Sequence, residues 1–227
     1  MTTDSTSQTA PPPPGRAASY EAMGLTGILF AVLAAIAIEM LRELPGWNAD
    51  HATVEQWFAQ SGNRTRMTVV VLVMVVASIA LLWFIGTIRR RLGSGEDQLF
   101  ATVFLGSGLV LIATLLTSIS AFSIPATLAS RVSPDAAADA YPVSYGLGMN
   151  LVTVIAPRLG AVLMLSLANL ARVSGAFPRC LTLLSTAAAL FMLIAVTTSI
   201  HIAWILPAWA LVVGVYIVLR RNQLPTV

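Results

Sequence analysis

Six long apolar stretches run through the sequence, and this pattern constrains the fold more than any other feature. Each stretch approaches or exceeds the ~20 residues with which an α-helix crosses ~30 Å of hydrocarbon. Charged residues make up only 10% of the 227-residue chain, against about a quarter in soluble domains. We therefore predict an all-α membrane protein, a six-transmembrane-helix bundle. Its predicted spans are about 23–41, 67–88, 99–122, 143–170, 180–200 and 204–219.

Polar tails flank this apolar region. Residues 1–20 carry the run Pro11–Pro14 and few apolar side chains, so this segment cannot bury enough surface to order itself. We predict a disordered Pro-rich cytoplasmic tail over residues 1–20 and a transmembrane domain over 21–221. A short cytoplasmic tail follows over 222–227.

The arginine residues set the predicted orientation, because cytoplasmic loops of membrane proteins carry an excess of positive charge. Every basic residue is Arg, and Ala and Val are abundant, as in proteins from GC-rich bacterial genomes. We predict a multi-pass protein of a bacterial plasma membrane with both termini cytoplasmic. The inner side then holds Arg16, Arg89, Arg90, Arg91, Arg172, Arg179, Arg220 and Arg221, and the outer side holds Arg42, Arg64, Arg66 and Arg131.

The first outer segment, Asn48–Asn63, has the pattern of a short helix. Thr53 and Gln56 have the spacing of a capping box, and Gly62 could end the helix. We expect this helix to lie on the membrane surface, either as an anchor, which we favour, or as a lid over a cavity. The second outer segment, Ile124–Pro142, is rich in Pro and Ala and is predicted as a loop. The apolar face of the short helix is Val54, Trp57 and Phe58.

Arg158 lies within the fourth predicted span, directly after Pro157. An Arg near the bilayer centre costs about 2.5–3.5 kcal/mol on insertion scales, so its side chain must find polar partners. Pro157 has no N–H group, which leaves the carbonyl of Thr153 without its helical donor and favours a kink. The guanidinium of Arg158 is placed to donate to carbonyls freed in this way.

Besides these carbonyls, we predict that Arg158 has an acidic side chain as a partner. Glu39 lies near the outer end of the first span, on the side of a small-residue stripe suited to close helix packing. Its local alternative is an ion pair with Arg42, three residues further along. Asn169 continues the face of Arg158 toward the inner side. The predicted ligand site is thus Arg158, Glu39, Asn169 and Pro157, and the stripe is Gly24, Gly27, Ala31 and Ala35.

Metal ligands are sparse. His51 and Glu55 stand four residues apart and offer half a site, which His201, at the outer end of the fifth span, could complete. These three are the candidate ligands, but we predict no resident metal, no cofactor and no catalytic residues. Cys180 is the sole cysteine and is expected to be structural. The arginines form no basic domain, which argues against a nucleic-acid partner.

The layout of the chain resembles a known group of proteins. An acidic outer segment with the pair Trp57–Phe58, then a long helix running into "IRRRLGSGEDQLF" at Ile88–Phe100, is similar to uncharacterised six-helix membrane proteins of bacteria. These are common in high-GC actinobacteria and are grouped as domains of unknown function. The resemblance covers most of residues 21–221. It implies an integral membrane protein and implies no catalytic residues.

Three function classes follow from these patterns, and an intramembrane enzyme ranks last because the sequence shows no nucleophile–base set. The preferred one is a non-enzymatic accessory, sensor or binding protein, with the lipid bilayer, an unidentified membrane protein and a small-molecule ligand as its partners. The alternative is a small transporter or permease-like protein in which Arg158 binds an anionic substrate. Polar side chains of the third span could line a path for it, or bond to their own helix, which we favour. They include Thr114, Thr117 and Ser118.

Overall fold

Helices make up nearly all of the chain that the structure describes. The computed structural model describes the backbone of residues 15–92, 98–174, 177–195 and 199–219, and no strand occurs in these ranges. The elements in chain order are α1 (Gly15–Leu41), α2 (His51–Ala59), α3 (Ser61–Leu92), α4 (Gln98–Arg131), α5 (Pro134–Asn150), the π-helical turn η1 (Leu151–Ile155), α6 (Ala156–Ser174), α7 (Arg179–Ile194), the 3₁₀ turn η2 (Ile200–Trp204) and α8 (Ile205–Leu219).

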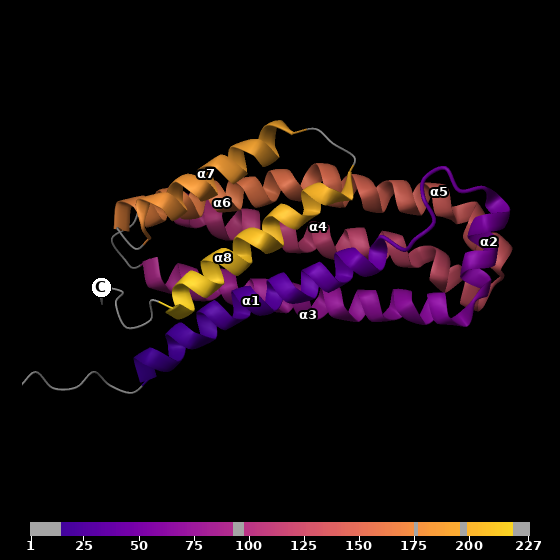
Figure 1. Cartoon of the computed structure of the whole chain (residues 1–227), viewed down its shortest axis with the longest axis horizontal. Coiled ribbons are helices and arrows are strands. Elements are labelled where there is room, and N and C mark those ends of the chain that lie inside the picture. The colour runs from indigo at the N-terminus through magenta and orange to yellow at the C-terminus, as the bar shows by residue number, and fades with distance from the viewer. Residues whose placement is uncertain (1–14, 93–97, 175–176, 196–198, 220–227) are drawn as a thin grey trace, which may run out of the picture.

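The helices form an elongated bundle. Long helices run side by side along its long axis, and α2 lies across one end (Figure 1). Five helical stretches are long and apolar enough to cross a membrane: Gly24–Leu41, Ser61–Arg89, Leu99–Arg131, Pro134–Val173 and Ile200–Leu219. Their number and hydropathy support a multi-pass membrane protein. The remaining predicted span, 180–200, is represented by α7, which has 16 residues and ends at Ile194.

The predicted loop over Ile124–Pro142 was wrong. There α4 continues as far as Arg131, and α5 begins at Pro134. The Ser133 side chain accepts a hydrogen bond from the N–H of Ala136, and Pro134 occupies the first turn, where its missing N–H has no cost. Ala-rich sequence then favours the helix. The prediction relied on the three prolines of this segment, but Pro134 begins α5, and Pro125 and Pro142 lie inside α4 and α5.

The start of α1 also differs from the prediction. The helix begins at Gly15, whereas the sequence pattern places the tail as far as residue 20. The rest of that tail, the charged loop over 93–97 and the predicted tail over 222–227 lie outside the described residues.

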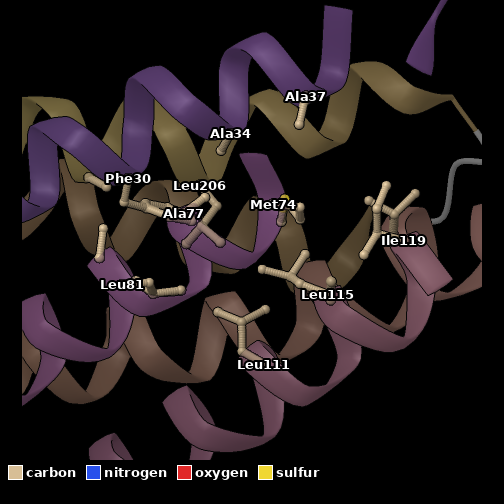
Figure 2. Close-up of a cluster of buried hydrophobic side chains, with 14 of the residues drawn as sticks. Phe30, Ala34, Ala37, Met74, Ala77, Leu81, Leu111, Leu115, Ile119 and Leu206 are labelled. Carbon is tan, nitrogen blue, oxygen red and sulfur yellow. The ribbon is translucent and has the colours of Figure 1, made fainter. Parts of the chain in front are cut away.

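The core is built from small and aliphatic side chains of several helices. Figure 2 shows side chains from α1, α3, α4 and α8 meeting in it, among them Phe30, Leu81, Leu111 and Leu206. The predicted small-residue stripe allows α1 to approach α8 and α3. A Cβ atom at Gly24 would lie 2.7 Å from the carbonyl oxygen of Gly214, so only glycine fits this crossing.

Candidate functional site

Arg158 uses its guanidinium on backbone carbonyls. Its Nη1 donates to the carbonyl of Val154 at 2.8 Å and, at 3.4 Å, to that of Thr153. Both carbonyls belong to the π-helical turn η1, which precedes Pro157. The predicted donation to carbonyls near Pro157 is therefore confirmed. The local disturbance takes the form of a π-helical turn, in which the i→i−4 pattern of the α-helix is interrupted.

A third bond joins Arg158 to another helix. Its Nη2 donates to the carbonyl of Ala195 at 3.0 Å, and Ala195 is the C-terminal cap of α7. The carbonyl end of a helix carries partial negative charge, so a guanidinium is favourable there. Arg158 therefore ties η1 and α6 to the end of α7, next to the connection that leads to α8.

The other members of the predicted ligand site lie elsewhere. Glu39 pairs with Arg42 through oxygen–nitrogen distances of 2.9 and 3.1 Å, and both side chains are exposed. The local alternative thus holds for Glu39, and the pair between Glu39 and Arg158 is absent. Asn169 accepts a hydrogen bond from Arg172 at 2.9 Å. Of the predicted set, only Pro157 and Arg158 are brought together.

Polar side chains inside the bundle mostly bond to their own helices. Thr114 and Thr117 donate to the carbonyls four residues earlier in α4, and Ser118 donates to the carbonyl of Gly148 in α5 at 2.9 Å. Near them lies an interior cavity of about 50 Å³, whose lining of Phe30, Met74, Leu206 and their neighbours is apolar except for Ser118. This lining suits a hydrocarbon group and not an ion.

At the end of the bundle where α2 lies, α2 packs against the first part of α5. We call α2 together with residues 134–145 of α5 the cap. The predicted capping role of Thr53 was wrong, because Asp50 is the N-cap and its carboxylate accepts from the N–H of Thr53 at 2.9 Å. The predicted apolar face of α2 is confirmed for Val54 and Phe58, which are buried. Trp57 is half-buried. Tyr141 packs on Phe58.

Tyr141 also anchors the segment that leads into α2. Its hydroxyl donates to the carbonyl of Pro45 at 2.5 Å, in a buried contact across 96 residues of sequence. The ring of Tyr141 stacks on Tyr145 with centroids 5.2 Å apart. The bond to Pro45 and the packing of Tyr141 on Phe58 hold α2 and the segment before it against α5.

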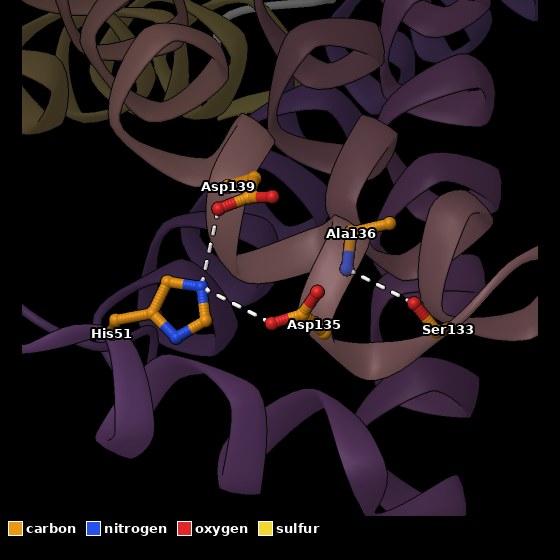
Figure 3. Close-up of polar contacts among 5 residues, drawn as sticks. All are labelled: His51, Ser133, Asp135, Ala136 and Asp139. Carbon is orange, nitrogen blue, oxygen red and sulfur yellow. Dashed lines mark hydrogen bonds and ion pairs between the residues drawn. The ribbon is translucent and has the colours of Figure 1, made fainter.

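Titratable side chains from the two helices of the cap converge. The Nε2 atom of His51 lies 3.2 Å from an oxygen of Asp139 and 3.6 Å from an oxygen of Asp135 (Figure 3). Glu55, one helical turn after His51, completes a group with His51 and Asp135 in which the ligand atoms all lie within 4.8 Å of one another. We call His51, Glu55, Asp135 and Asp139 the cap cluster.

An aromatic pocket adjoins the cap cluster. It has a volume of about 110 Å³ and is lined by Trp47, His51, Tyr141, Tyr145 and their neighbours. Trp47 leans on Tyr145, with ring centroids 6.0 Å apart. Aromatic faces and carboxylates both attract positive charge. The cap is therefore suited to a cation.

Sequence reasoning found half of this cluster. It selected His51 and Glu55, but it assigned His201 to complete the set, whereas His201 lies in η2, outside the cap cluster. Asp135 and Asp139 were missed because their segment was predicted as a loop. Their spacing of four residues, the same as that of His51 and Glu55, was the signal that could have found them once a helix was assigned there.

Comparison with known proteins adds no relative. A scan against protein-family models, a search of curated proteins and a search of solved structures each found no match. The site is therefore interpreted from its own chemistry.

Proposed function

We propose that this chain is a non-enzymatic sensor of a bacterial plasma membrane that binds a small cationic ligand at the cap. In this proposal α7 forms the sixth span, both termini are cytoplasmic, and the cap lies outside. The resemblance to six-helix bacterial membrane proteins accords with this architecture. The observation that carries the proposal is the cap cluster beside an aromatic pocket, on a helix that continues through the bundle to Arg158.

Helix lengths support an aqueous position for the cap. The apolar stretch Pro134–Val173 has 40 residues and is about 60 Å long at 1.5 Å per residue, twice the ~30 Å of hydrocarbon. In Figure 1, the end of α7 and the start of α8 both lie well short of the end at which α2 lies. If these two helices match the bilayer, the N-terminal part of α5 projects beyond it. Exposed carboxylates at Asp135 and Asp139 are consistent with water there.

A continuous helix supports signal transmission. Asp135 and Asp139 stand near the start of α5, and α5 passes through η1 directly into α6. Arg158 lies one turn beyond η1 and holds the end of α7 through Ala195. A π-helical turn is a frequent feature of functional sites because its hydrogen bonds can rearrange. Movement of α5 on ligand binding would therefore act on η1 and on the bond to α7.

The alternative, an anion transporter that uses Arg158, receives less support. Three carbonyls occupy the guanidinium of Arg158, which favours a clamp over a substrate site. The interior cavity of about 50 Å³ is apolar and offers an anion little stabilisation.

Cys180 provides a reporter for the sensor. It is the sole cysteine and is exposed in the first turn of α7. The test is to label Cys180 with an environment-sensitive fluorophore, place the full chain in lipid nanodiscs, and titrate Zn²⁺, Mn²⁺ and tetramethylammonium separately. We expect at least one cation to change the emission, and the change to disappear in the double variant Asp135→Asn, Asp139→Asn. Unchanged emission with all three cations would overturn the sensor proposal.

A further inference from the structure

We infer that the cap cluster is a binding site for one divalent transition-metal ion, with Zn²⁺ as the best-fitting ion. This inference rests on the proposed function, because it names the class of cation that the cap takes. It can also be tested independently of signalling. Four observations carry it: the helical spacing of the ligands, their distances, their chemical mixture and their unbalanced charge.

The spacing of the ligands places them on facing surfaces. His51 and Glu55 are four residues apart on α2, and Asp135 and Asp139 are four residues apart on α5. Residues four apart lie one above the other on the same face of a helix. The two helices pack together through Phe58 and Tyr141, so each contributes a pair of donors to the same space.

The distances are close to those of a tetrahedral site. Bonds of about 2.0–2.2 Å from zinc to nitrogen and oxygen place neighbouring ligand atoms roughly 3.4 Å apart. The separations from Nε2 of His51 are 3.2 Å to Asp139 and 3.6 Å to Asp135, which bracket this value. The group of His51, Glu55 and Asp135 extends to 4.8 Å. In the proposed site, rotation of the carboxylate side chains closes that gap.

The chemical mixture selects the class of ion. Calcium and magnesium sites use oxygen ligands, and magnesium retains much of its water. Imidazole nitrogen favours zinc, copper, iron and nickel instead, and zinc also binds the oxygen atoms of Asp and Glu. One imidazole with two or three carboxylates therefore offers ligand atoms that zinc accepts, with room for a water molecule or a ligand atom.

The charge of the cluster calls for a cation. The arginine–carboxylate ion pairs formed within the described ranges are Arg42 with Glu39 and Arg66 with Glu43, so no carboxylate of the cluster has an arginine partner. Glu55, Asp135 and Asp139 therefore carry up to three negative charges around one imidazole. A divalent ion bound among these carboxylates relieves their mutual repulsion.

The experiment measures metal binding directly on the full chain in nanodiscs. After treatment with EDTA and its removal, calorimetric titration with Zn²⁺ is compared between the wild type, His51→Gln and the double variant Asp135→Asn, Asp139→Asn. The matched control is Glu39→Gln, which removes one carboxylate of an exposed pair outside the cap. Titration with Co²⁺ adds a second readout, because tetrahedral cobalt absorbs strongly in the visible range.

We expect one Zn²⁺ per chain in the wild type and the Glu39→Gln control. Affinity should fall at least tenfold in His51→Gln and in the aspartate double variant. Because the ligands are exposed, the variants should keep the helical circular dichroism of the wild type, and Zn²⁺ should raise the melting temperature of the wild type alone. The inference would be overturned if the wild type did not bind Zn²⁺. It would also be overturned if all four chains bound Zn²⁺ equally, since that result would show adventitious binding only.

The two proposals fail separately. If Zn²⁺ binds as described but the Cys180 fluorophore does not respond to any cation, the metal site stands and the sensor does not. If tetramethylammonium changes the emission while Zn²⁺ does not bind, the cap is a site for organic cations and the metal inference is wrong.

Discussion

The guanidinium of Arg158 donates to the carbonyl oxygen of Ala195 at 3.0 Å, across 37 residues of sequence. The same side chain donates to Val154 at 2.8 Å within its own helix. One side chain therefore donates hydrogen bonds both to a carbonyl of the π-helical turn and to the carbonyl at the C-terminal end of α7. These are two places at which regular helical hydrogen bonding stops.

Arg158→Gln should lower the free energy of unfolding by roughly 2 kcal/mol, since hydrogen bonds to charged groups contribute about 1.5–3 kcal/mol. The free energy of unfolding of Arg158→Lys should lie between those of the wild type and Arg158→Gln, because a single ammonium group cannot donate to all of the same carbonyls. Thermal melting in nanodiscs checks this, with Arg172→Gln, an exposed residue of the same helix, as the control. An unchanged melting temperature in Arg158→Gln would return the residue to the anion-binding alternative.

Gly24→Ala should destabilise the bundle by about 1–3 kcal/mol, the usual cost of an extra methyl group in a packed contact. Its Cβ would lie 2.7 Å from the backbone oxygen of Gly214, and backbone cannot move aside as a side chain can. The control is Gly86→Ala in α3, where a Cβ meets nothing within 4 Å. That change should be neutral or stabilising, since Ala is the better helix former. Equal effects of the two substitutions would refute the close crossing of α1 and α8.

Ser185→Ala should cost about 1–3 kcal/mol, because it leaves the buried indole N–H of Trp209 without an acceptor. The donor atom Nε1 lies 3.0 Å from the Ser185 hydroxyl, and this bond joins α7 to α8. Ser120→Ala is the control, since its exposed hydroxyl bonds only within α4. Equilibrium unfolding in detergent mixtures gives the free energy of unfolding of both variants. If the two variants lose the same stability, the bond between α7 and α8 does not contribute.

The fold was largely predictable from hydropathy, and the errors of that prediction at the helix ends have a physical cause. Apolar runs mark helices that lie in hydrocarbon, so the helices and their order follow from the sequence. Their ends do not, because a helix that leaves the bilayer continues in water when its caps and Ala content allow it. Pro134 illustrates this limit. A proline in the interior of a helix tends to break the helix, whereas a proline in the first turn, as here, is favourable.

The candidate site was predictable only in part. Arg158 and its carbonyl partners follow from the adjacent Pro157, because both effects are local. The cap cluster depends on the packing of α2 against α5, which joins residues more than 80 positions apart. Spacing within each helix identifies donor pairs such as His51 and Glu55. Which pairs face each other is decided by tertiary contacts such as that of Tyr141 with Pro45.

The first turn of α2 should become less stable at low pH, because Asp50 caps it with a charged carboxylate. Hydrogen bonds from the side chain and the backbone N–H of Thr53 lower the pKa of Asp50. A lowered pKa in the folded state stabilises the helix above the unfolded pKa, and this contribution is lost as the pH falls through the folded pKa. Hydrogen exchange of residues 51–59, corrected for intrinsic rates, should therefore show less protection at low pH. In Asp50→Asn, which keeps a capping oxygen without the charge, this component of the acid dependence should be absent, and its persistence would exclude Asp50 as the cause.

Crossing of the bilayer by α7 can be decided with the native cysteine. Cys180 is exposed at the start of α7, and the proposed orientation, based on the arginine distribution, puts that end in the cytoplasm. A membrane-impermeant maleimide should therefore label Cys180 only after cells are permeabilised. His201, exposed in η2 beyond the other end of α7, provides the matched position. His201→Cys in a Cys180→Ser background should be labelled in intact cells. Labelling of both positions from the same side would mean that α7, with 16 residues, enters the membrane without crossing it. The chain would then have five spans instead of the proposed six, and the N- and C-termini would lie on opposite sides.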